Sequence, residues 1–254
     1  MSRTKTEFRA LAVRVRGEVR AGDNLAKVLL SGMEESEVTL QAGDVLVVKH
    51  KVVSKAEGRL VKLETVRPSA ASRTWAKRYD LDARVTELAL RESKRVVRRK
   101  RGVLITETRH GWVCANSGVD VSNVDGGTHA LLLPEDADQS AAKLRRDIKR
   151  LTGIAVAVII SDSFGRAWRE GLTEAAIGVA GMKPLDDLRG RRDRHGYRLR
   201  VSLEAVADEL AGVAGLLCGK LKQTPACVVR GFAYPAGQGR ATELVRAAAF
   251  DLFR

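Results

Sequence analysis

Aspartates, a serine and a lysine follow apolar runs at three places in the chain, and their types suit metal and phosphate chemistry. In IISDS, Asp162 and Ser163 end one apolar run; in GVDVSN, Asp120 and Asn123 occupy a polar loop after another. Carboxylates with a neighbouring hydroxyl are ligands that hard cations such as Mg²⁺ or Mn²⁺ prefer. Lys55, after the apolar run GDVLVV, could meet phosphate as a point charge. Spacing alone favours the plainer alternative, in which the aspartates only cap turns.

Other familiar motifs are absent or incomplete. GLLCGKL resembles a phosphate-binding loop, but its earlier glycine stands one residue too close to Gly219-Lys220, and Leu221 replaces the Ser or Thr that would hold magnesium. No GxGxxG follows a predicted strand, and the four histidines lack the pair spacing of a zinc site. The three cysteines show no CxxC spacing, so neither a zinc knuckle nor a disulfide framework is predicted.

The elements that must position these residues are strands and helices in mixed order, without a strict βαβ rhythm. Alternating or continuous apolar runs predict strands at 8–16, 43–55, 102–108, 154–162 and 226–232, with a short one opening the loop of 111–127. The segment 43–55 is expected to end in a polar loop at Ser54-Lys55. Helices are predicted at 21–34, at 80–101, at 202–221 and at 241–254, and a further one is predicted with Ser140 as its N-terminal cap and Gly153 as its end. A tight bend is expected at His195-Gly196.

The composition is that of a soluble globular protein with an unusual positive charge. A chain of 254 residues can form one large domain or two closely packed subdomains. No apolar run is long enough for a membrane span, and the charged start, MSRTKTEFRALAVRVRG, is no secretory signal, so a cytoplasmic location without membrane partners is expected. The net charge of +14 indicates an anionic partner. Aromatic residues make up only 4%, and no nucleic-acid-binding motif appears, so composition leaves nucleic acid and phosphorylated small molecules both open.

Long segments of the chain resemble the coenzyme F420:L-glutamate ligase family. They span from about residue 10 to the C-terminus, in the family's order: GDVLVVKHKVVSKAEGRLV, LITETRHGWVCANSGVDVSNV, LLPEDADQSAAKLR, ISDSFGRAWREG, AAIGVAGMKPLDDLRGRRDRHGYRLRVSLEAVADELA and TPACVVRGF. The chain is similar to the stand-alone ligase rather than to the form with an added flavin-binding reductase domain.

The resemblance implies a GTP-dependent ligation of L-glutamate to the phospholactyl carboxylate of a deazaflavin coenzyme precursor. The acceptor carboxylate would be activated as an acyl phosphate, and the reaction could continue to a γ-linked glutamate tail. Members of this family use Mg²⁺ or Mn²⁺, often with K⁺, and form intertwined homodimers, so the resemblance implies the same for this chain. Its mixed α and β (α+β) fold is neither a P-loop nor a Rossmann fold, which suits the incomplete phosphate loop of this chain.

Site residues follow from the resemblance, position by position. Asp120, Asp162 and Ser163 match metal-binding positions, and Lys55 and Asn123 match contacts with GTP. The remaining positions that match GTP contacts form one short stretch and two isolated residues: Arg16, Gly17, Glu18, Val19, His50 and Lys220. Asp120, Asp162 and Lys55 would carry the catalysis by holding metal and phosphate.

Three of these positions depart from the family pattern. Gly17 stands where proline is common, His50 where relatives have a small polar residue, and Lys220 where archaeal members have a metal-binding glutamine. A lysine ammonium cannot ligate a cation, so Lys220 is expected to contact phosphate instead.

The residues after Asp162 complete the predicted site. Arg166 and Arg169 could face anionic substrate groups, whereas Trp168 is expected to be packed in the interior. Two rival functions remain: a ligase of the same fold that acts on another phosphorylated acceptor or amino acid, and a basic nucleic-acid-binding protein.

Overall fold

The centre of the molecule is a five-stranded sheet in a computed structural model that describes residues 7–122, 125–219 and 222–251. The strand order is β1 (Arg9–Val13), β12 (Ala226–Arg230), β2 (Val45–Lys49), β8 (Ala157–Arg166) and β9 (Arg169–Ala180). Only β2 and β8 run parallel, and the other neighbours are antiparallel. The predicted mixture of α and β is confirmed, and this strand order differs from the mostly parallel sheet of a Rossmann fold.

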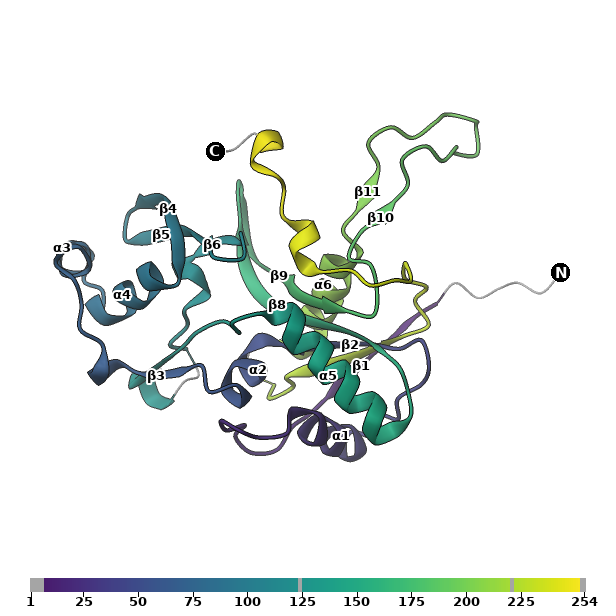
Figure 1. The fold of residues 1–254 in the computed structure, drawn as a ribbon, viewed down its shortest axis with the longest axis horizontal. Coiled ribbons are helices and arrows are strands. Elements are labelled where there is room, and N and C mark those ends of the chain that lie inside the picture. Colours follow the sequence, from purple (N-terminus) through teal and green to yellow (C-terminus); the bar gives the residue numbers. More distant parts are fainter. Residues whose placement is uncertain (1–6, 123–124, 220–221, 252–254) are drawn as a thin grey trace.

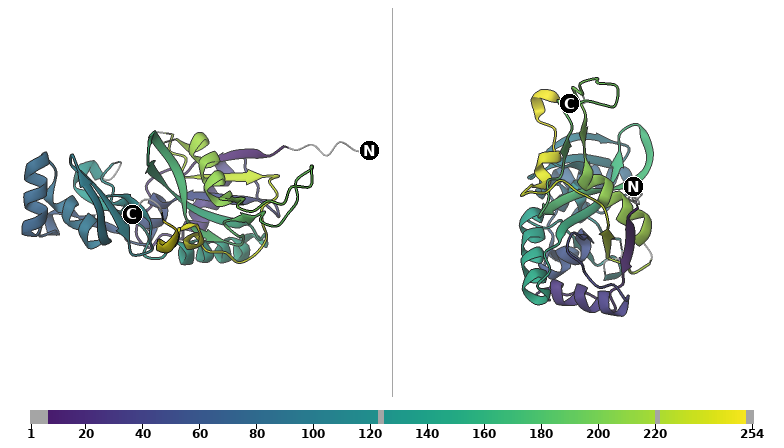
Figure 2. Two further views of the ribbon diagram at one scale, coloured as in Figure 1. Left: turned by 90° about the horizontal axis from the view of Figure 1, so that it is seen from above. Right: turned by 90° about the vertical axis from the view of Figure 1, so that its right-hand side faces the viewer.

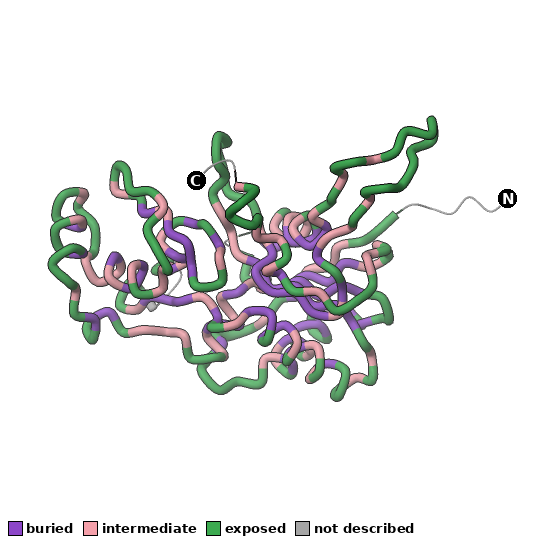
Figure 3. Tube along the Cα trace, turned by 45° about the horizontal axis from the view of Figure 1, so that its top comes forward, coloured by how far each residue is buried: buried purple, intermediate pink, exposed green. Residues whose placement is uncertain are grey.

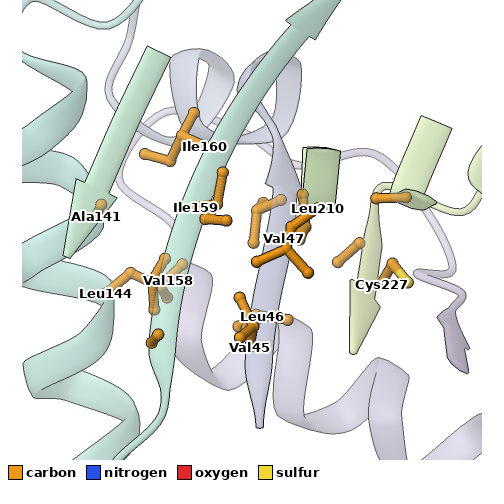
Figure 4. Packing of buried hydrophobic residues seen from close by; sticks show 14 of the residues in the cluster. Val45, Leu46, Val47, Ala141, Leu144, Val158, Ile159, Ile160, Leu210 and Cys227 are labelled. Carbon is orange, nitrogen blue, oxygen red and sulfur yellow. The ribbon is translucent and has the colours of Figure 1, made fainter. Parts of the chain in front are cut away.

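The middle strands form the core because they are continuously apolar. Val45, Leu46, Val47 and Val48 are all at most 1% exposed, as is the run of β8 from Ala157 to Ile160. Such runs suit strands that are covered on both faces. Figure 4 shows Val158 beside Leu144 and Val47 beside Leu210, and these two leucines belong to different helices.

Helices cover both faces of this sheet (Figure 1). Helices α1 (Leu25–Glu35) and α5 (Ala137–Thr152) lie on one face, and α6 (Val206–Cys218) lies on the other. Two helix carboxylates fasten the edge strand β9: Asp138 accepts a hydrogen bond from Val179 N, and Asp208 accepts one from Ala176 N, both at 2.8 Å. These bonds satisfy backbone donors at an otherwise open sheet edge.

A smaller lobe extends from one end of the sheet (Figure 2). It contains helices α3 (Ala70–Tyr79) and α4 (Ala83–Arg91) and a three-stranded sheet of β4 (Ser93–Lys100), β5 (Val103–Thr108) and β6 (Val113–Ala115). A second hydrophobic cluster lies beneath it and includes Leu63, Leu88 and Leu132. The two-stranded sheet of β3 (Leu60–Lys62) and β7 (His129–Leu131) joins this lobe to the centre.

Several exposed segments project from the body (Figure 3). The β8–β9 hairpin extends beyond the sheet, and a long arm rises from β10 (Asp186–Asp187) and β11 (Leu203–Glu204). The bend predicted in this arm is confirmed, because Gly196 has a positive φ of 83° and its N–H donates to Asp193. No helix among the described residues is long and apolar enough to cross a membrane.

Four element predictions were wrong. The strand predicted over 43–55 ends at Lys49, and α2 (His50–Ala56) begins at once. The helix predicted over 80–101 ends at Arg91, and its basic second half forms strand β4, paired with β5.

The other two errors concern a cap and the C-terminal segment. Asp136, not Ser140, caps α5, since its side chain accepts a bond from Gln139 N; the predicted end at Gly153 is confirmed. The predicted terminal helix is replaced by short 3₁₀ turns at Ala241–Leu244 and Ala248–Phe250. Short helices are unstable without packing, and Phe250 remains 72% exposed.

Candidate active site

Helix α2 begins where the central sheet ends and presents two adjacent polar residues, His50 and Lys51. His50, Val53 and Ser54 are buried at the i, i+3, i+4 spacing of one helix face. This periodicity explains why the polar half of the predicted strand folds as a helix. The turn from β2 into α2 thereby places His50 and Lys51 at the carboxyl end of a buried strand.

Asp162 of β8 lies beside His50. Its Oδ1 is 3.3 Å from His50 Nε2, and the two side chains are only 13% and 3% exposed. His50 Nδ1 is 3.3 Å from Ser54 Oγ, whereas the buried Nε2 makes no hydrogen bond of acceptable geometry. Cys114 of β6 is also near, since burial and the charge of Asp162 raise its pKa to about 12. Asp162 therefore lies in a confined polar space, within strand β8, which continues beyond the predicted end at Asp162 to Arg166.

Asp120 contacts the next residue of α2. Lys51 Nζ is 2.7 Å from Asp120 Oδ2 and also donates to the backbone oxygen of Ser122 at 2.9 Å. Asp120 Oδ1 accepts a hydrogen bond from Ser122 N at 2.7 Å. Burial alone would raise the pKa of Asp120, but the hydrogen bonds from Lys51 and Ser122 outweigh it and lower the pKa. Asp120 is thus held as a carboxylate.

Asp120 and Asp162 both contact the start of α2, where their partners Lys51 and His50 are consecutive residues. Two carboxylates and a buried imidazole nitrogen without a hydrogen bond are donors that fit a divalent cation. No group of three or more His, Cys, Asp and Glu side chains gathers for a metal within the described part of the chain. Water and phosphate oxygens would have to complete the coordination, as is usual for Mg²⁺.

Ser163 lies on the opposite face of β8 from Asp162, since consecutive strand residues point to opposite faces. Its backbone N–H donates to Asp162 Oδ1 at 2.7 Å, and the residue pairs with Glu174 across the hairpin. The Ser163 hydroxyl therefore points away from Asp162, and the Ser163 group that contacts this carboxylate is an N–H, which cannot ligate a cation.

Arg166 and Arg169 lie at the far end of the hairpin, paired with each other. They are exposed, and Arg166 Nη2 donates to the backbone oxygen of Glu170 at 2.8 Å. Arg166 is the fourth residue after Asp162 along the strand, which is roughly 13 Å away. The structure therefore does not bring these arginines to the aspartates. Trp168 between them is 78% exposed, so the expectation that it is packed in the interior was wrong.

Lys55 lies beside Glu18, one residue of the stretch Arg16–Val19. Lys55 Nζ forms an ion pair with Glu18 Oε1, and the Lys55 side chain is 15% exposed. Gly17 has a positive φ of 78°, a conformation closed to the proline that the family pattern would place there. Val19 is buried, and Arg16 forms an exposed ion pair with Glu35 at 3.0 Å. Asn123 and Lys220 lie outside the described residues.

The segment GLLCGKL, which resembles a phosphate-binding loop, lies at the wrong end of a helix for that role. Its Gly219 caps the C-terminal end of α6. A P-loop precedes a helix and offers the backbone N–H groups of the helix N-terminus to phosphate. The segment therefore cannot bind phosphate in that way.

Sequence reasoning missed Lys51, and also a buried group formed by Lys49, Ser161 and Glu174. Lys51 has a partner far away in the sequence, so no local pattern indicates it. Lys49 and Ser161 do carry a signal, because each is a polar residue that directly ends a continuous apolar strand.

Comparison with known proteins places this arrangement in a family. The sequence profile of F420-0:Gamma-glutamyl ligase matches residues 14–231. The chain is 42% identical to coenzyme F420:L-glutamate ligase of Methanothermobacter thermautotrophicus and 43% identical to that of Methanopyrus kandleri, each over 93% of this chain and 94% of the relative. It is 42% identical to the protein of the same name from Archaeoglobus fulgidus, over 93% of this chain and 92% of the relative.

Proposed function

This chain belongs to the F420-0:gamma-glutamyl ligase family, and from that membership we propose that it ligates L-glutamate to the coenzyme F420 precursor, using GTP. The acceptor is the phospholactyl carboxylate of the precursor, and the product is an amide. The observation that carries the assignment of the site is that Asp162 and Asp120 contact His50 and Lys51, two adjacent residues of α2.

The reaction requires activation, because a carboxylate and an amine do not condense in water. An acceptor carboxylate oxygen attacks the γ-phosphorus of GTP, the bond to the β-phosphate oxygen breaks, and GDP leaves. The glutamate nitrogen then attacks the acyl carbon of the acyl phosphate. Inorganic phosphate leaves with one former carboxylate oxygen, and the nitrogen loses a proton.

The residues at the site suit this chemistry, which depends mainly on positioning and on stabilising charge. Lys51 and Lys55 offer cations for the phosphates, although each is held by a carboxylate of this chain, Asp120 and Glu18. Binding of GTP would exchange these carboxylate contacts for phosphate contacts. Lys220 is assigned a phosphate contact by the resemblance alone.

A divalent cation, Mg²⁺ or Mn²⁺, would be held by Asp120 and Asp162, and the resemblance adds Ser163. When bound, it would neutralise the phosphate charge that develops during transfer. Potassium as a further cation, a homodimeric assembly and a cytoplasmic location complete the proposal and rest on the family resemblance.

Oxygen-isotope transfer tests the acyl phosphate. Precursor labelled with ¹⁸O in its lactyl carboxylate should yield inorganic phosphate that carries one ¹⁸O per amide formed. Unlabelled phosphate, with amide formed at the usual rate, would contradict the acyl-phosphate route. ATP in place of GTP serves as the nucleotide control.

A further inference from the structure

A buried charged cluster lies on the face of the central sheet that α6 covers. Lys49 Nζ is 2.5 Å from Glu174 Oε1, and the two side chains are 20% and 9% exposed. Ser161, which is fully buried, donates its hydroxyl hydrogen to Glu174 Oε2 at 2.8 Å. The Glu174 carboxylate therefore joins three neighbouring strands, β2, β8 and β9.

The cluster lies at the point where the β8–β9 hairpin leaves the sheet. Lys49 and Ser161 form the last register pair between β2 and β8, so beyond Ser161 strand β8 pairs only with β9. The ladder between β8 and β9 is also shifted there, between Ile160 and Ser161. A two-stranded ribbon that starts at an irregularity is only marginally fixed by its backbone.

Asp162 is the first residue of this ribbon after the last three-strand contact. Its side chain points to the opposite face from Ser161, toward His50. The direction in which the ribbon leaves the sheet therefore determines where the Asp162 carboxylate lies relative to α2.

Helix α6 leaves room for the cluster at Gly215. A Cβ atom placed on Gly215 would lie 2.6 Å from Glu174 Cγ, which is too close for any real contact. On the same helix, a Cβ atom placed on Gly212 would meet nothing within 4 Å. The fit between α6 and Glu174 thus depends on one glycine and leaves the other free to change.

We propose that Glu174, held by Lys49 and Ser161, is a positioning residue that fixes the departure of the β8–β9 ribbon and thereby aims Asp162 at α2. This inference rests on the proposed function, because Asp162 is assigned there to metal and phosphate chemistry. A buried ion pair is weak support for stability, since apolar residues of similar size often replace such pairs without loss. Positioning gives the cluster a role that apolar residues could not fill.

Two variants disturb the cluster of Lys49, Ser161 and Glu174 without removing only one of its two charges, and we call them the clamp variants. Lys49→Met combined with Glu174→Met replaces both ions by residues of similar length, so the fold should survive. Gly215→Ala keeps both ions and displaces Glu174, and Gly212→Ala is its matched control with the same gain in helix propensity. We expect kcat to fall about 100-fold in the double variant and in Gly215→Ala, the loss that a misplaced catalytic group can cause. The KM for GTP and the melting temperature should stay close to those of the parent, and Gly212→Ala should match the parent in all three.

A distance measurement separates this inference from the proposed function. Spin labels at Glu34→Cys on α1 and Glu170→Cys on the hairpin report the ribbon's direction by double electron–electron resonance, because the three native cysteines are buried. The distance distribution should broaden or shift in the clamp variants and remain that of the parent in Gly212→Ala. An unchanged distribution in the folded clamp variants would overturn the inference, and so would a changed one with the parent's kcat. An inactive parent would contradict the proposed function alone, and the distances would then decide the inference.

Discussion

At the scale of single residues, the site consists of carboxylates that already have cationic or imidazole neighbours. Asp120 is paired with Lys51, and Asp162 lies next to the buried His50. Such pairs keep the carboxylates oriented before a ligand arrives. They also imply that binding of a metal and GTP is an exchange of partners.

Replacing either aspartate by asparagine should abolish most turnover while the protein stays folded. Asp120→Asn and Asp162→Asn should each reduce kcat on the order of 10²-fold or more, the size of loss that follows removal of a group stabilising transition-state charge. The double variant should lose little more, because residues that act as one unit are not additive. Turnover at saturating Mg²⁺ and GTP, together with melting temperatures, checks this. Near-normal turnover in either single variant would mean that the aspartates do not share a metal.

The sequence marks the two aspartates as candidates, but it does not show which residues contact them. Each aspartate follows an apolar run, which is visible in the sequence. Lys51 and Glu174 act through partners far away in the chain, so only the fold shows their role. Trp168 failed for a related reason: tryptophan is usually buried, but the hairpin carries this one beyond the core.

At the scale of elements, capping decides where the helices begin. Asp136→Ala should lower the free energy of unfolding by about 1 kcal/mol, because Gln139 N loses its acceptor at the start of α5. Asp136→Asn is the matched control and should lose much less, since asparagine caps equally well. Urea unfolding of the two variants measures the difference. Equal stability of the two would contradict this assignment of the cap.

The lobe that contains α3 and α4 should become less stable in acid, because Glu87 is then protonated. Hydrogen bonds from Ser69 N and Ser72 Oγ lower the pKa of Glu87 from 4.5 to about 2. A carboxyl whose pKa is lower in the folded state stabilises the fold at pH values above its unfolded-state pKa. This stabilisation is lost as the pH falls through the folded-state pKa.

Glu87→Gln should therefore be less stable than the parent near neutral pH, and the difference should narrow as the pH falls from 4.5 toward 2. Thermal unfolding of both proteins across this range tests the prediction. A difference that stays constant with pH would show that the charge of Glu87 is not involved.

Elements in which apolar residues follow one clear periodicity could be predicted from the sequence. Segments in which this periodicity changes from that of a helix to that of a strand, or the reverse, could not. The continuous apolar runs of β8 and β12 are correctly placed at their cores, and so is α1, where Asn24 is the cap. The segment 80–101 reads as one helix because its charged residues are compatible with one. Pairing with β5 overrides that preference and makes its second half a strand.

At the scale of the whole molecule, the projecting arm and helix α6 carry exposed apolar side chains that a homodimer could bury. Val201 at the base of the arm and Leu216 on α6 are each 87% exposed. Val201→Glu combined with Leu216→Glu should shift the protein from dimer to monomer in light scattering at micromolar concentration. Leu151→Glu, at an exposed site on α5, is the control and should remain dimeric. A parent protein that is monomeric and fully active would contradict the proposed assembly.

The family, and with it the proposed reaction, could be inferred from the sequence because resemblance covers nearly the whole chain. The net charge of +14 could not decide between nucleic acid and small anions. Part of this charge lies on the exposed arm, which includes Arg198 and Arg200. No motif in the sequence of the arm indicates which anion it binds.

Mass spectrometry of the reaction products is the most direct test of the proposed reaction. Purified protein is incubated with the deazaflavin precursor, L-glutamate, Mg²⁺ and GTP, and parallel reactions omit the nucleotide or contain ATP. The precursor should gain one or more glutamyl residues, with GDP and phosphate formed in step with each amide. Absence of a glutamylated product, or equal product without GTP, would contradict a GTP-dependent glutamate ligase.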